Sequence, residues 1–356
     1  MEFIPEWAPN IHPLIVHFPI GILLLAFGLN LASLFFSDKW WDEQKSTLLY
    51  VIGGLSAFVA FRTGKEAADS IFLVTEAQSV LSTHADWATW TVWFFIIYAV
   101  ARIALHWFKL LDRKAFQVLA LLAVAPGVFL LFETAEHGGE LVYGYGAGTG
   151  QLIEEEVFEP VISDSSSSII STSFNSEENG DWSWEMSQNS VTELLENFHW
   201  VNGSITQLTP LSIEFDDNYV LQLSASESAN SFVTHYTYQN IQMDLVLNIG
   251  ELEGEIEIIH HLKDENNYDY VRLNSNGMVT QGRISDGSDE IFEQSEASVS
   301  GWLSLRVVAD GTHFRGYINQ EMIVHGHGDA PETGFVGLNI SGKGTMVLDR
   351  IELTQL

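Results

Sequence analysis

Hydrophobic residues are concentrated in four long runs near the start of the chain, and short alternating runs follow them. The long runs cover about 15–36, 46–61, 87–108 and 115–132. A helix needs roughly 20 residues to cross the hydrocarbon core of a bilayer. The first and third runs meet this length, and the other two meet it when flanking polar residues extend the helix. Because no run leaves a polar face for water, the pattern predicts four transmembrane helices rather than a soluble helical core.

From about residue 186 the hydrophobic period changes to two. The alternating runs include 219–223, 243–247, 303–308 and 346–353. Gly, Asn and Asp separate them at fairly regular spacing, which is typical of a β-sandwich. The intervening segment 151–185 is rich in Ser and acidic residues, so we interpret it as a linker. The predicted fold class is a membrane all-α four-helix bundle over 1–150, followed by an all-β sandwich of jelly-roll type over 186–356.

Charge separates the two regions. Residues 1–150 carry 8 Lys and Arg against 13 Asp and Glu, whereas residues 151–356 carry 7 against 34, a net charge of −27. Such a domain repels nucleic acid and anionic lipid, so we expect neither as its partner. The chain contains no cysteine. This excludes disulfides, thiolate metal sites, iron–sulfur clusters and covalently attached c-type haem.

Basic residues in the short loops predict the orientation. The loops after the first and third runs carry Lys39, Lys45, Lys109, Arg113 and Lys114, and Arg102 lies late in the third run. The loop after the second run carries only Arg62 and Lys65. The positive-inside rule then places the N-terminus and the β domain outside the cytoplasm. Acidic residues precede the first run, so we interpret it as a retained helix rather than a cleaved signal peptide. We expect a multi-pass protein of the bacterial inner membrane with a periplasmic β domain.

Four of the five histidines in the first 150 residues fall into one layer. With alternating helix directions, His12, His17, His84 and His137 all lie near the outer ends of the predicted helices. Ionisable residues at membrane depth are costly and usually functional, and imidazole is a common ligand of haem iron. Histidines on different helices of a four-helix bundle can hold a b-type haem between them. Arg62 and Lys65 are then candidates for pairing with the haem propionates.

Two alternatives stand beside haem for these histidines. A non-haem metal is one, with His17, His84 and His137 as ligands and Glu133 on the helix face of His137, because carboxylate plus imidazole suits iron, manganese, copper or zinc. The other is simple hydrogen bonding at helix ends. Gly53 and Gly54 in the second run favour haem, because glycine allows a planar group to approach a helix closely.

Two motifs at the ends of this region resemble a known family. Residues 10–21 read NIHPLIVHFPIG, and residues 136–148 read EHGGELVYGYGAG. Both are similar to the opening and closing motifs of the DUF2231 family of predicted four-helix membrane proteins. The glycines of the second motif predict a tightly folded exit loop. The resemblance implies a small membrane module of the kind often associated with respiratory or cytochrome-like proteins, and it implies no settled activity.

The second region resembles the concanavalin-like and laminin-G-like jelly rolls, including the family labelled 3-keto-disaccharide hydrolase. The segments that carry this resemblance are 267–273 (NYDYVRL), 301–307 (GWLSLRV), 316–319 (GYIN) and 334–338 (GFVGL). It implies binding of sugars or proteins, and in some members Ca²⁺. Trp302 and Arg306 fit sheet positions as well as site positions. The alternating Glu253, Glu255 and Glu257 are candidate catalytic carboxylates. Two pairs of histidines, His260 with His261 and His325 with His327, are candidate metal ligands.

These observations leave three functional hypotheses. The first is a membrane-anchored redox subunit, in which haem b passes electrons within a larger complex and the β domain docks a partner. The second is a non-redox anchor that presents a glycan-binding or protein-binding jelly roll. The third makes the jelly roll a glycan hydrolase, which needs two placed carboxylates.

Overall fold

The computed structural model describes residues 10–35, 42–149, 173–216 and 218–356. The chain divides into two compact units, Met1–Ile153 and Glu154–Leu356. We refer to them as the helical unit and the β unit, and each is described by itself.

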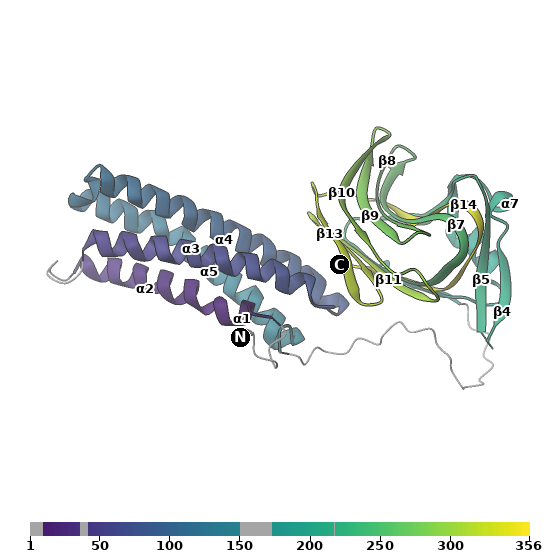
Figure 1. Cartoon of the computed structure of the whole chain (residues 1–356), viewed down its shortest axis with the longest axis horizontal. Helices are drawn as coiled ribbons and strands as arrows, with labels where there is room; N and C mark the ends of the chain where they lie inside the picture. The colour runs from purple at the N-terminus through teal and green to yellow at the C-terminus, as the bar shows by residue number, and fades with distance from the viewer. Residues whose placement is uncertain (1–9, 36–41, 150–172, 217) are drawn as a thin grey trace. The chain divides into compact units, whose positions relative to one another are not determined.

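The helical unit is a bundle of long helices (Figure 1). Its elements are α1 (His12–Ile15), α2 (His17–Ser33), α3 (Glu43–Asp69), α4 (Thr75–Trp107), the 3₁₀ turn η1 (Leu110–Asp112) and α5 (Lys114–Tyr145). Four stretches, His12–Ser33, α3, α4 and α5, are long and apolar enough to cross a membrane. The predicted set of four spans is therefore confirmed, although Lys39 lies outside the described residues.

Three helices, α3, α4 and α5, extend beyond the hydrophobic runs. α3 begins at the cap Asp42, whose side chain accepts the N–H of Lys45 at 2.9 Å, and α5 continues to Tyr145. Gly138, Gly139 and Gly144 therefore lie inside α5. The predicted exit loop was wrong at these glycines, because good helix formers around them keep the backbone helical. The turn begins at Gly146, which caps α5 at φ 74°, a backbone conformation that glycine adopts readily.

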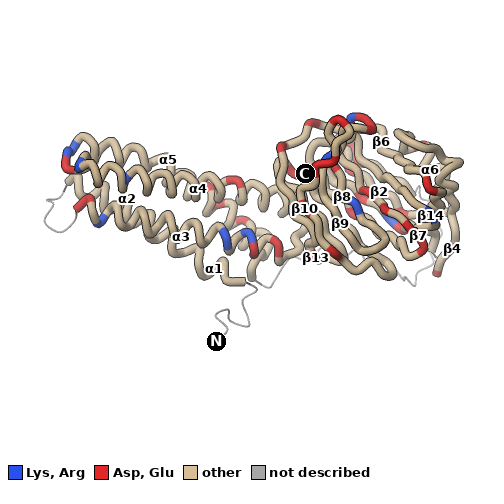
Figure 2. Tube along the Cα trace, turned by 45° about the horizontal axis from the view of Figure 1, so that its top comes forward, with Lys and Arg blue, Asp and Glu red and all other residues tan. Residues whose placement is uncertain are grey.

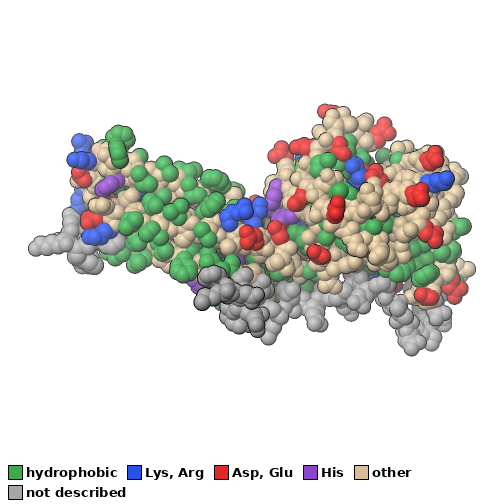
Figure 3. Space-filling model, viewed as in Figure 1, with side chains coloured by type: hydrophobic (Ala, Val, Ile, Leu, Met, Phe, Trp, Pro, Cys, Tyr) green, Lys and Arg blue, Asp and Glu red, His purple; other side chains and the backbone are tan. Residues whose placement is uncertain are grey.

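The helical unit is packed inside and hydrophobic outside. Leu23, Tyr50 and Phe95 are buried between helices. By contrast, Ile97 and Leu122 are 66% and 65% exposed. Figure 3 shows hydrophobic side chains covering the middle of the bundle, with charged ones near its ends. A surface of this kind is stable in lipid, because hydrocarbon tails replace water around the exposed Leu and Ile side chains.

The β unit contains fourteen strands and two short helices among the described residues. The strands are β1 (Phe174–Ser176), β2 (Trp182–Glu185), β3 (Phe198–Asn202), β4 (Leu211–Phe215), β5 (Asn218–Ser226), β6 (Asn230–Tyr238), β7 (Ile241–Asp264), β8 (Asn267–Asn274), β9 (Met278–Ser285), β10 (Ser288–Glu296), β11 (Leu303–Asp310), β12 (His313–Ile318), β13 (Glu321–His327) and β14 (Gly334–Gln355). The helices are α6 (Ser190–Asn197) and α7 (Ile205–Leu208). The all-β prediction is confirmed. The linker prediction extended too far, since β1 and β2 pair with each other and β2 pairs with β14. Residues 150–172 of that segment lie outside the described residues.

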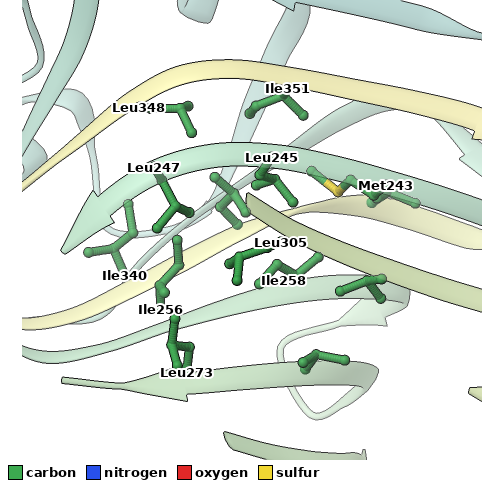
Figure 4. Packing of buried hydrophobic residues seen from close by; sticks show 14 of the residues in the cluster. Met243, Leu245, Leu247, Ile256, Ile258, Leu273, Leu305, Ile340, Leu348 and Ile351 are labelled. Atoms are coloured by element: carbon green, nitrogen blue, oxygen red, sulfur yellow. The ribbon is translucent and has the colours of Figure 1, made fainter. Parts of the chain in front are cut away.

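Two long antiparallel strands, β7 and β14, run through both layers of the sandwich. The first layer contains the N-terminal part of β7 and the C-terminal part of β14, with β2, β5, β11, β12 and β13. The second layer contains their other halves, with β3, β6, β8, β9 and β10. Leu245, Leu247 and Leu305 from the first layer face Ile256 and Ile258 from the second (Figure 4). These buried side chains hold the layers together.

Glycines occupy the bend where β7 and β14 pass between the layers. Gly254 and Gly342 are partners in the register of the two strands. Gly342 has φ +113°, and a Cβ atom added there would lie 2.4 Å from the carbonyl oxygen of Glu253. Any larger residue would force the strands apart, so the bend depends on glycine.

Candidate functional site

In the helical unit, His12 and His84 are seated against glycines of neighbouring helices. The ring of His12 lies against Gly64 of α3, and the ring of His84 lies against Gly138 of α5. His12 Nδ1 is 3.2 Å from Thr63 Oγ1, and His84 Nδ1 is 3.0 Å from the Thr134 carbonyl oxygen. Both imidazoles are therefore held between helices.

His12 and His137 lie close enough to His84 that a positive charge on either ring would oppose one on His84. His137 donates Nδ1–H to the Glu133 carbonyl at 2.8 Å and stacks on Trp87 at a ring distance of 6.5 Å. The structure thus brings three of the four predicted histidines together. His17 is exposed, and its Nδ1 lies 2.8 Å from the Pro13 carbonyl oxygen. Its assignment as a ligand stays a prediction.

These histidines share one protonation pattern. In His17, His84 and His137, Nδ1 faces a backbone carbonyl, which can only accept a hydrogen bond. Thr63 donates its own hydroxyl proton to the Ala60 carbonyl, so it accepts from His12 Nδ1. In each neutral ring the lone pair is consequently on Nε2. This is the tautomer of a metal-ligating histidine, whose other nitrogen usually donates to a carbonyl.

The other residues assigned to a haem site have different surroundings. Arg62 and Lys65 are exposed on α3. A Cβ atom at Gly53 would meet the Leu23 side chain at 2.5 Å, and one at Gly54 would lie 3.3 Å from the Phe95 carbonyl oxygen. The two glycines therefore serve close packing of α3 against α2 and α4. The prediction that they make room for a planar group was wrong, because side-chain and backbone atoms fill that space.

A buried ion pair in the same unit was missed by sequence reasoning. Arg102 in α4 is 0% exposed, and its Nη2 lies 2.6 Å from Glu43 Oε2 at the start of α3. The guanidinium also donates to Asn30 Oδ1 and Thr47 Oγ1, each at 3.3 Å. We interpreted Arg102 as one of the basic residues that fix orientation. Its position inside a hydrophobic run was the available signal, because a charge there is stable only when it is paired.

In the β unit, a row of polar side chains crosses the outer face of the second layer. Neighbouring strands place these residues in register, and paired residues of an antiparallel sheet point to the same face. The row consists of Ser231 (β6), Asn339 (β14), Glu257 (β7), Arg272 (β8), Thr280 (β9) and Gln294 (β10). We call this set the polar row. Figure 2 shows acidic and basic positions close together where β7, β8 and β9 run side by side.

Hydrogen bonds connect the members of the polar row. Ser231 Oγ donates to Asn339 Oδ1 at 2.9 Å, and Asn339 Nδ2 donates to Glu257 Oε2 at 2.7 Å. Arg272 Nε donates to Glu257 Oε1 at 2.7 Å. Glu257 is only 2% exposed. Its carboxylate is thus a fixed acceptor at the centre of the row, and solvent reaches the half-buried Arg272 and Asn339.

Tyrosines lie beside this row on the same strands. Arg272 Cζ is 4.4 Å from the centroid of the Tyr270 ring, and the Tyr270 hydroxyl donates to Asp289 Oδ1 at 2.5 Å. The Tyr268 hydroxyl donates to Glu257 Oε2 at 3.4 Å. Burial, followed by the interaction with Glu257, raises the pKa of Tyr268 above its usual range. Both hydroxyls therefore remain protonated donors at neutral pH.

Glu253, Glu255 and Glu257 do alternate along β7 as expected. Glu255 is half-buried and accepts long hydrogen bonds from Asn274 and Ser341, each at 3.5 Å. Glu257 is occupied by Arg272 and Asn339. These carboxylates are therefore held by neighbouring side chains of the sheet. Arg306, another candidate, is buried in an ion pair with Asp244 at 2.6 Å, and Trp302 contacts the Phe215 ring.

His260 and His261 form a buried cluster with Asp269. Their Nδ1 atoms are 2.7 Å apart, and His261 Nε2 donates to the Gln239 carbonyl. Burial lowers the pKa of His260 to about 3. Burial opposes ionisation of Asp269, but hydrogen bonds from His261 and Arg283 outweigh it and lower the pKa of that carboxyl to about 2. The two Nδ1 atoms lie at hydrogen-bonding distance from each other, and metal binding by this cluster stays a prediction.

The second pair of histidines, His325 and His327, is joined by His313. His313 on β12 is the register partner of His327 on β13. Among the described residues, the groups of three metal-ligating side chains whose ligand atoms lie within 4.8 Å of one another are this set and the set of His260, His261 and Asp269. The spacing of two residues in the sequence indicated the pair of His325 and His327. It could not indicate His313, because the register of β12 against β13 is a tertiary property.

Comparison with known proteins agrees with the division into two units. Residues 8–151 match the model of the family described as "Predicted membrane protein (DUF2231)". The resemblance predicted from the two end motifs is thereby confirmed. None of the curated proteins matches the chain.

Several solved structures are similar to part of the chain. The carbohydrate-binding module CBM66 from Bacillus subtilis is 15% identical, with 43% of this chain and 94% of that chain covered and a TM-score of 0.35. A protein of unknown function with a galectin-like fold from Bacillus subtilis is 12% identical, with coverages of 47% and 93% and a TM-score of 0.37. A Bacillus licheniformis β-glucanase is 8% identical, with coverages of 45% and 92% and a TM-score of 0.35. At such identities the likeness concerns the fold alone.

Proposed function

We propose that this protein is a membrane-anchored glycan-binding protein, in which the four long helices hold the chain in a bilayer and the polar row contacts a sugar. The observation that carries the proposal is the polar row itself: a sheet face on which amide, guanidinium, carboxylate and hydroxyl groups lie in register and bond to one another, with Arg272 and Asn339 half-buried and Gln294 exposed. This corresponds to the second of the three sequence hypotheses.

The chemistry of the row matches that of a sugar. A pyranose presents several hydroxyl groups along a flat ring, and each can donate and accept. Asn339 and Arg272 supply planar donors, and the half-buried Glu255 supplies an acceptor, whereas the buried Glu257 holds the two donors in place. Mutual hydrogen bonds already fix these side chains, so binding would cost little side-chain entropy. Tyr268 adds an aromatic ring with a polar end, a side-chain type enriched at binding surfaces.

The charge of the β unit narrows the class of ligand. A net charge of −27 over residues 151–356 disfavours polyanions at physiological salt. We therefore expect a neutral or basic glycan rather than a sulfated or highly acidic one. An extracytoplasmic position, expected from the positive-inside rule, would expose the face to such polymers.

Calorimetric titration of full-length protein in detergent micelles with a panel of neutral, basic and acidic oligosaccharides tests this proposal. A neutral or basic sugar should bind, and Arg272→Ala and Asn339→Ala should each weaken it at least about tenfold, which equals loss of one good hydrogen bond to a charged group. Lys263→Ala is the matched control, because Lys263 lies at the end of β7 in an exposed ion pair with Glu332. Binding that survives both row variants, or binding of no oligosaccharide in the panel, would reject the polar row as a glycan site.

A second proposal concerns the helical unit. We propose that His84, with His12 or His137, ligates haem iron or another transition metal, as the first sequence hypothesis expects. The shared tautomer supports this, since Nδ1–H donation leaves Nε2 of each ring as the electron donor. A haem held there would exchange single electrons. Arg62 and Lys65 would be available to its propionates.

An absorption spectrum of full-length protein, expressed with ample haem and then reduced with dithionite, tests the second proposal. Sharp bands on reduction, lost in His84→Ala but kept in His106→Ala, are expected. His106 is an exposed histidine in the last turn of α4. A flat visible spectrum together with no bound transition metal by elemental analysis would show that the histidines are structural.

A further inference from the structure

The edge of the first layer carries three histidines in a triangle. His325 and His327 are two residues apart on β13, so their side chains point to the same face. His313 on β12 pairs with His327. Ring centroids are 4.8 Å apart for His325 and His327, 5.0 Å for His313 and His327, and 6.5 Å for His313 and His325. One ring nitrogen from each lies within 4.8 Å of the others.

These side chains lie on the outer face of the layer. Phe314 and Val324 on the same strands are buried in the hydrophobic core, and side chains alternate between the two faces of a strand. His313 is 5% exposed, His325 is half-buried and His327 is exposed. Figure 3 shows histidine side chains gathered at the surface of the β unit. The cluster therefore combines one fixed imidazole with two that remain accessible.

From this geometry we propose that His313, His325 and His327 form a binding site for a divalent transition metal, with zinc as the best match. Three neutral imidazoles with a fourth position open to water are a ligand set that zinc accepts in tetrahedral geometry. Zn–N distances of about 2.0–2.1 Å put the ligand nitrogens roughly 3.4 Å apart. The present upper span of 4.8 Å is larger than this, so the imidazoles move closer together when they ligate one ion.

Charged groups of both signs lie beside the three imidazoles, because Arg315 on β12 is the register partner of His325. Asp310 is the register partner of His313 across the β11–β12 hairpin. Glu293 on β10 accepts the backbone N–H of His325. A carboxylate beside a neutral ligand set attracts a divalent cation, and the acidic β unit raises the local cation concentration. The polar row lies on the second layer, so the metal site is separate from the proposed glycan surface.

The test uses full-length protein in detergent, stripped with a chelator and titrated with Zn²⁺ alone. Wild type should bind one equivalent of zinc more than the variant His325→Ala/His327→Ala. The zinc affinity of this site should fall by more than about 100-fold in the variant, because losing two ligands costs more than losing a residue that only hydrogen-bonds a ligand. Zinc should also raise the melting temperature of wild type, because it binds the folded state, and should not raise that of the variant.

Controls separate this site from the other histidines. His235→Ala removes an exposed histidine of β6 and should keep the equivalent. His84→Ala/His137→Ala should also keep it, which excludes the helical unit as its location. Arg272→Ala should keep it as well, so failure of the glycan proposal leaves this one intact. Equal zinc binding by wild type and a folded His325→Ala/His327→Ala variant would overturn the metal site.

Discussion

Arg102 Nη2 lies 2.6 Å from Glu43 Oε2, joining the end of α4 to the start of α3 inside a unit whose outer surface is hydrophobic. The Arg102 side chain is completely buried, and its Cζ is 5.2 Å from the Tyr50 ring centroid. A charge in this position is stable only with its partner, because the interior solvates it poorly. The pair therefore fixes which faces of α3 and α4 meet.

Removing one member of this pair should destabilise the helical unit strongly. We expect Arg102→Met to cost about 3–5 kcal/mol, because the Glu43 carboxylate is left without its partner. Thermal unfolding in detergent measures the loss. Arg113→Met, at an exposed position, is the control. The double variant Arg102→Met/Glu43→Gln should recover part of the loss, since it removes the charge that was left alone. Identical melting of Arg102→Met and wild type would contradict a structural role for the pair.

The site residues show where sequence reasoning stops. Alternating helix directions sufficed to place His12, His84 and His137 in one layer, because helix order and span length fix the ends. The same argument grouped His17 with them, and its ring is exposed. The polar row could not be predicted, because it requires the register of six strands, including β14, which joins β6 to β7 from far along the chain. Arg102 was assigned by charge alone, and its partners Asn30 and Glu43 come from other helices.

Gly342 provides a test of the bend between the two layers. We expect Gly342→Ala to destabilise the β unit by about 3 kcal/mol, because backbone strain at φ +113° adds to a contact with the Glu253 carbonyl oxygen. For a unit of this size the melting temperature should fall by roughly 6–12 °C. Gly301→Ala is the control: its φ is +75° and no atom lies within 4 Å of the added Cβ. Its cost should be the strain alone, about 1–2 kcal/mol. Equal losses in the two variants would show that the bend tolerates a side chain.

The buried histidine pair predicts acid lability of the β unit. Unfolded His260 titrates near pH 6.5, whereas burial lowers its folded pKa to about 3. Between these values the unfolded chain binds a proton that the folded chain refuses, so stability is full above pH 6.5 and falls as the pH decreases. Asp269, with a folded pKa of about 2, adds a further loss below its unfolded value of 3.8. Each proton contributes a slope of about 1.4 kcal/mol per pH unit.

Scanning calorimetry between pH 7.5 and pH 4 measures this dependence. His260→Asn should reduce the slope below pH 6 by about one proton, although it lowers stability at neutral pH. His235→Asn, at an exposed position, should leave the slope unchanged. A slope that does not depend on residue 260 would mean that His260 is protonated or solvated in the folded chain.

The fold itself followed more directly from the sequence than the sites did. Long apolar runs fix the membrane helices, because the bilayer requires length and hydrophobicity. Helix ends were less predictable: α3 and α5 continue through polar residues such as Lys65 and Glu140, which still favour helix. β1 and β2 were assigned to a linker, because the Trp182–Glu185 strand is short and its alternation is hidden by serines and acids. This strand pairs with residues 350–353 of β14, and that pairing cannot be inferred from the local sequence of β2.

The orientation of the helical unit can be tested directly, because the chain contains no cysteine and an introduced one reports its own side. Lys109, Arg113 and Lys114 lie near the α4–α5 connection, at one end of the helices. Arg62 and Lys65 lie in the last turns of α3, near the α3–α4 connection at the other end. The positive-inside rule then predicts that Asp112→Cys faces the cytoplasm and Ser70→Cys faces outside.

A membrane-impermeant thiol reagent added to intact spheroplasts should label Ser70→Cys, and it should label Asp112→Cys only after lysis. Ser285→Cys, at the exposed end of β9, should follow Ser70→Cys, because an even number of crossings returns the β unit to the side of the N-terminus. The reverse labelling would place the β unit in the cytoplasm, where extracellular glycans are absent, and the glycan proposal would fail with it.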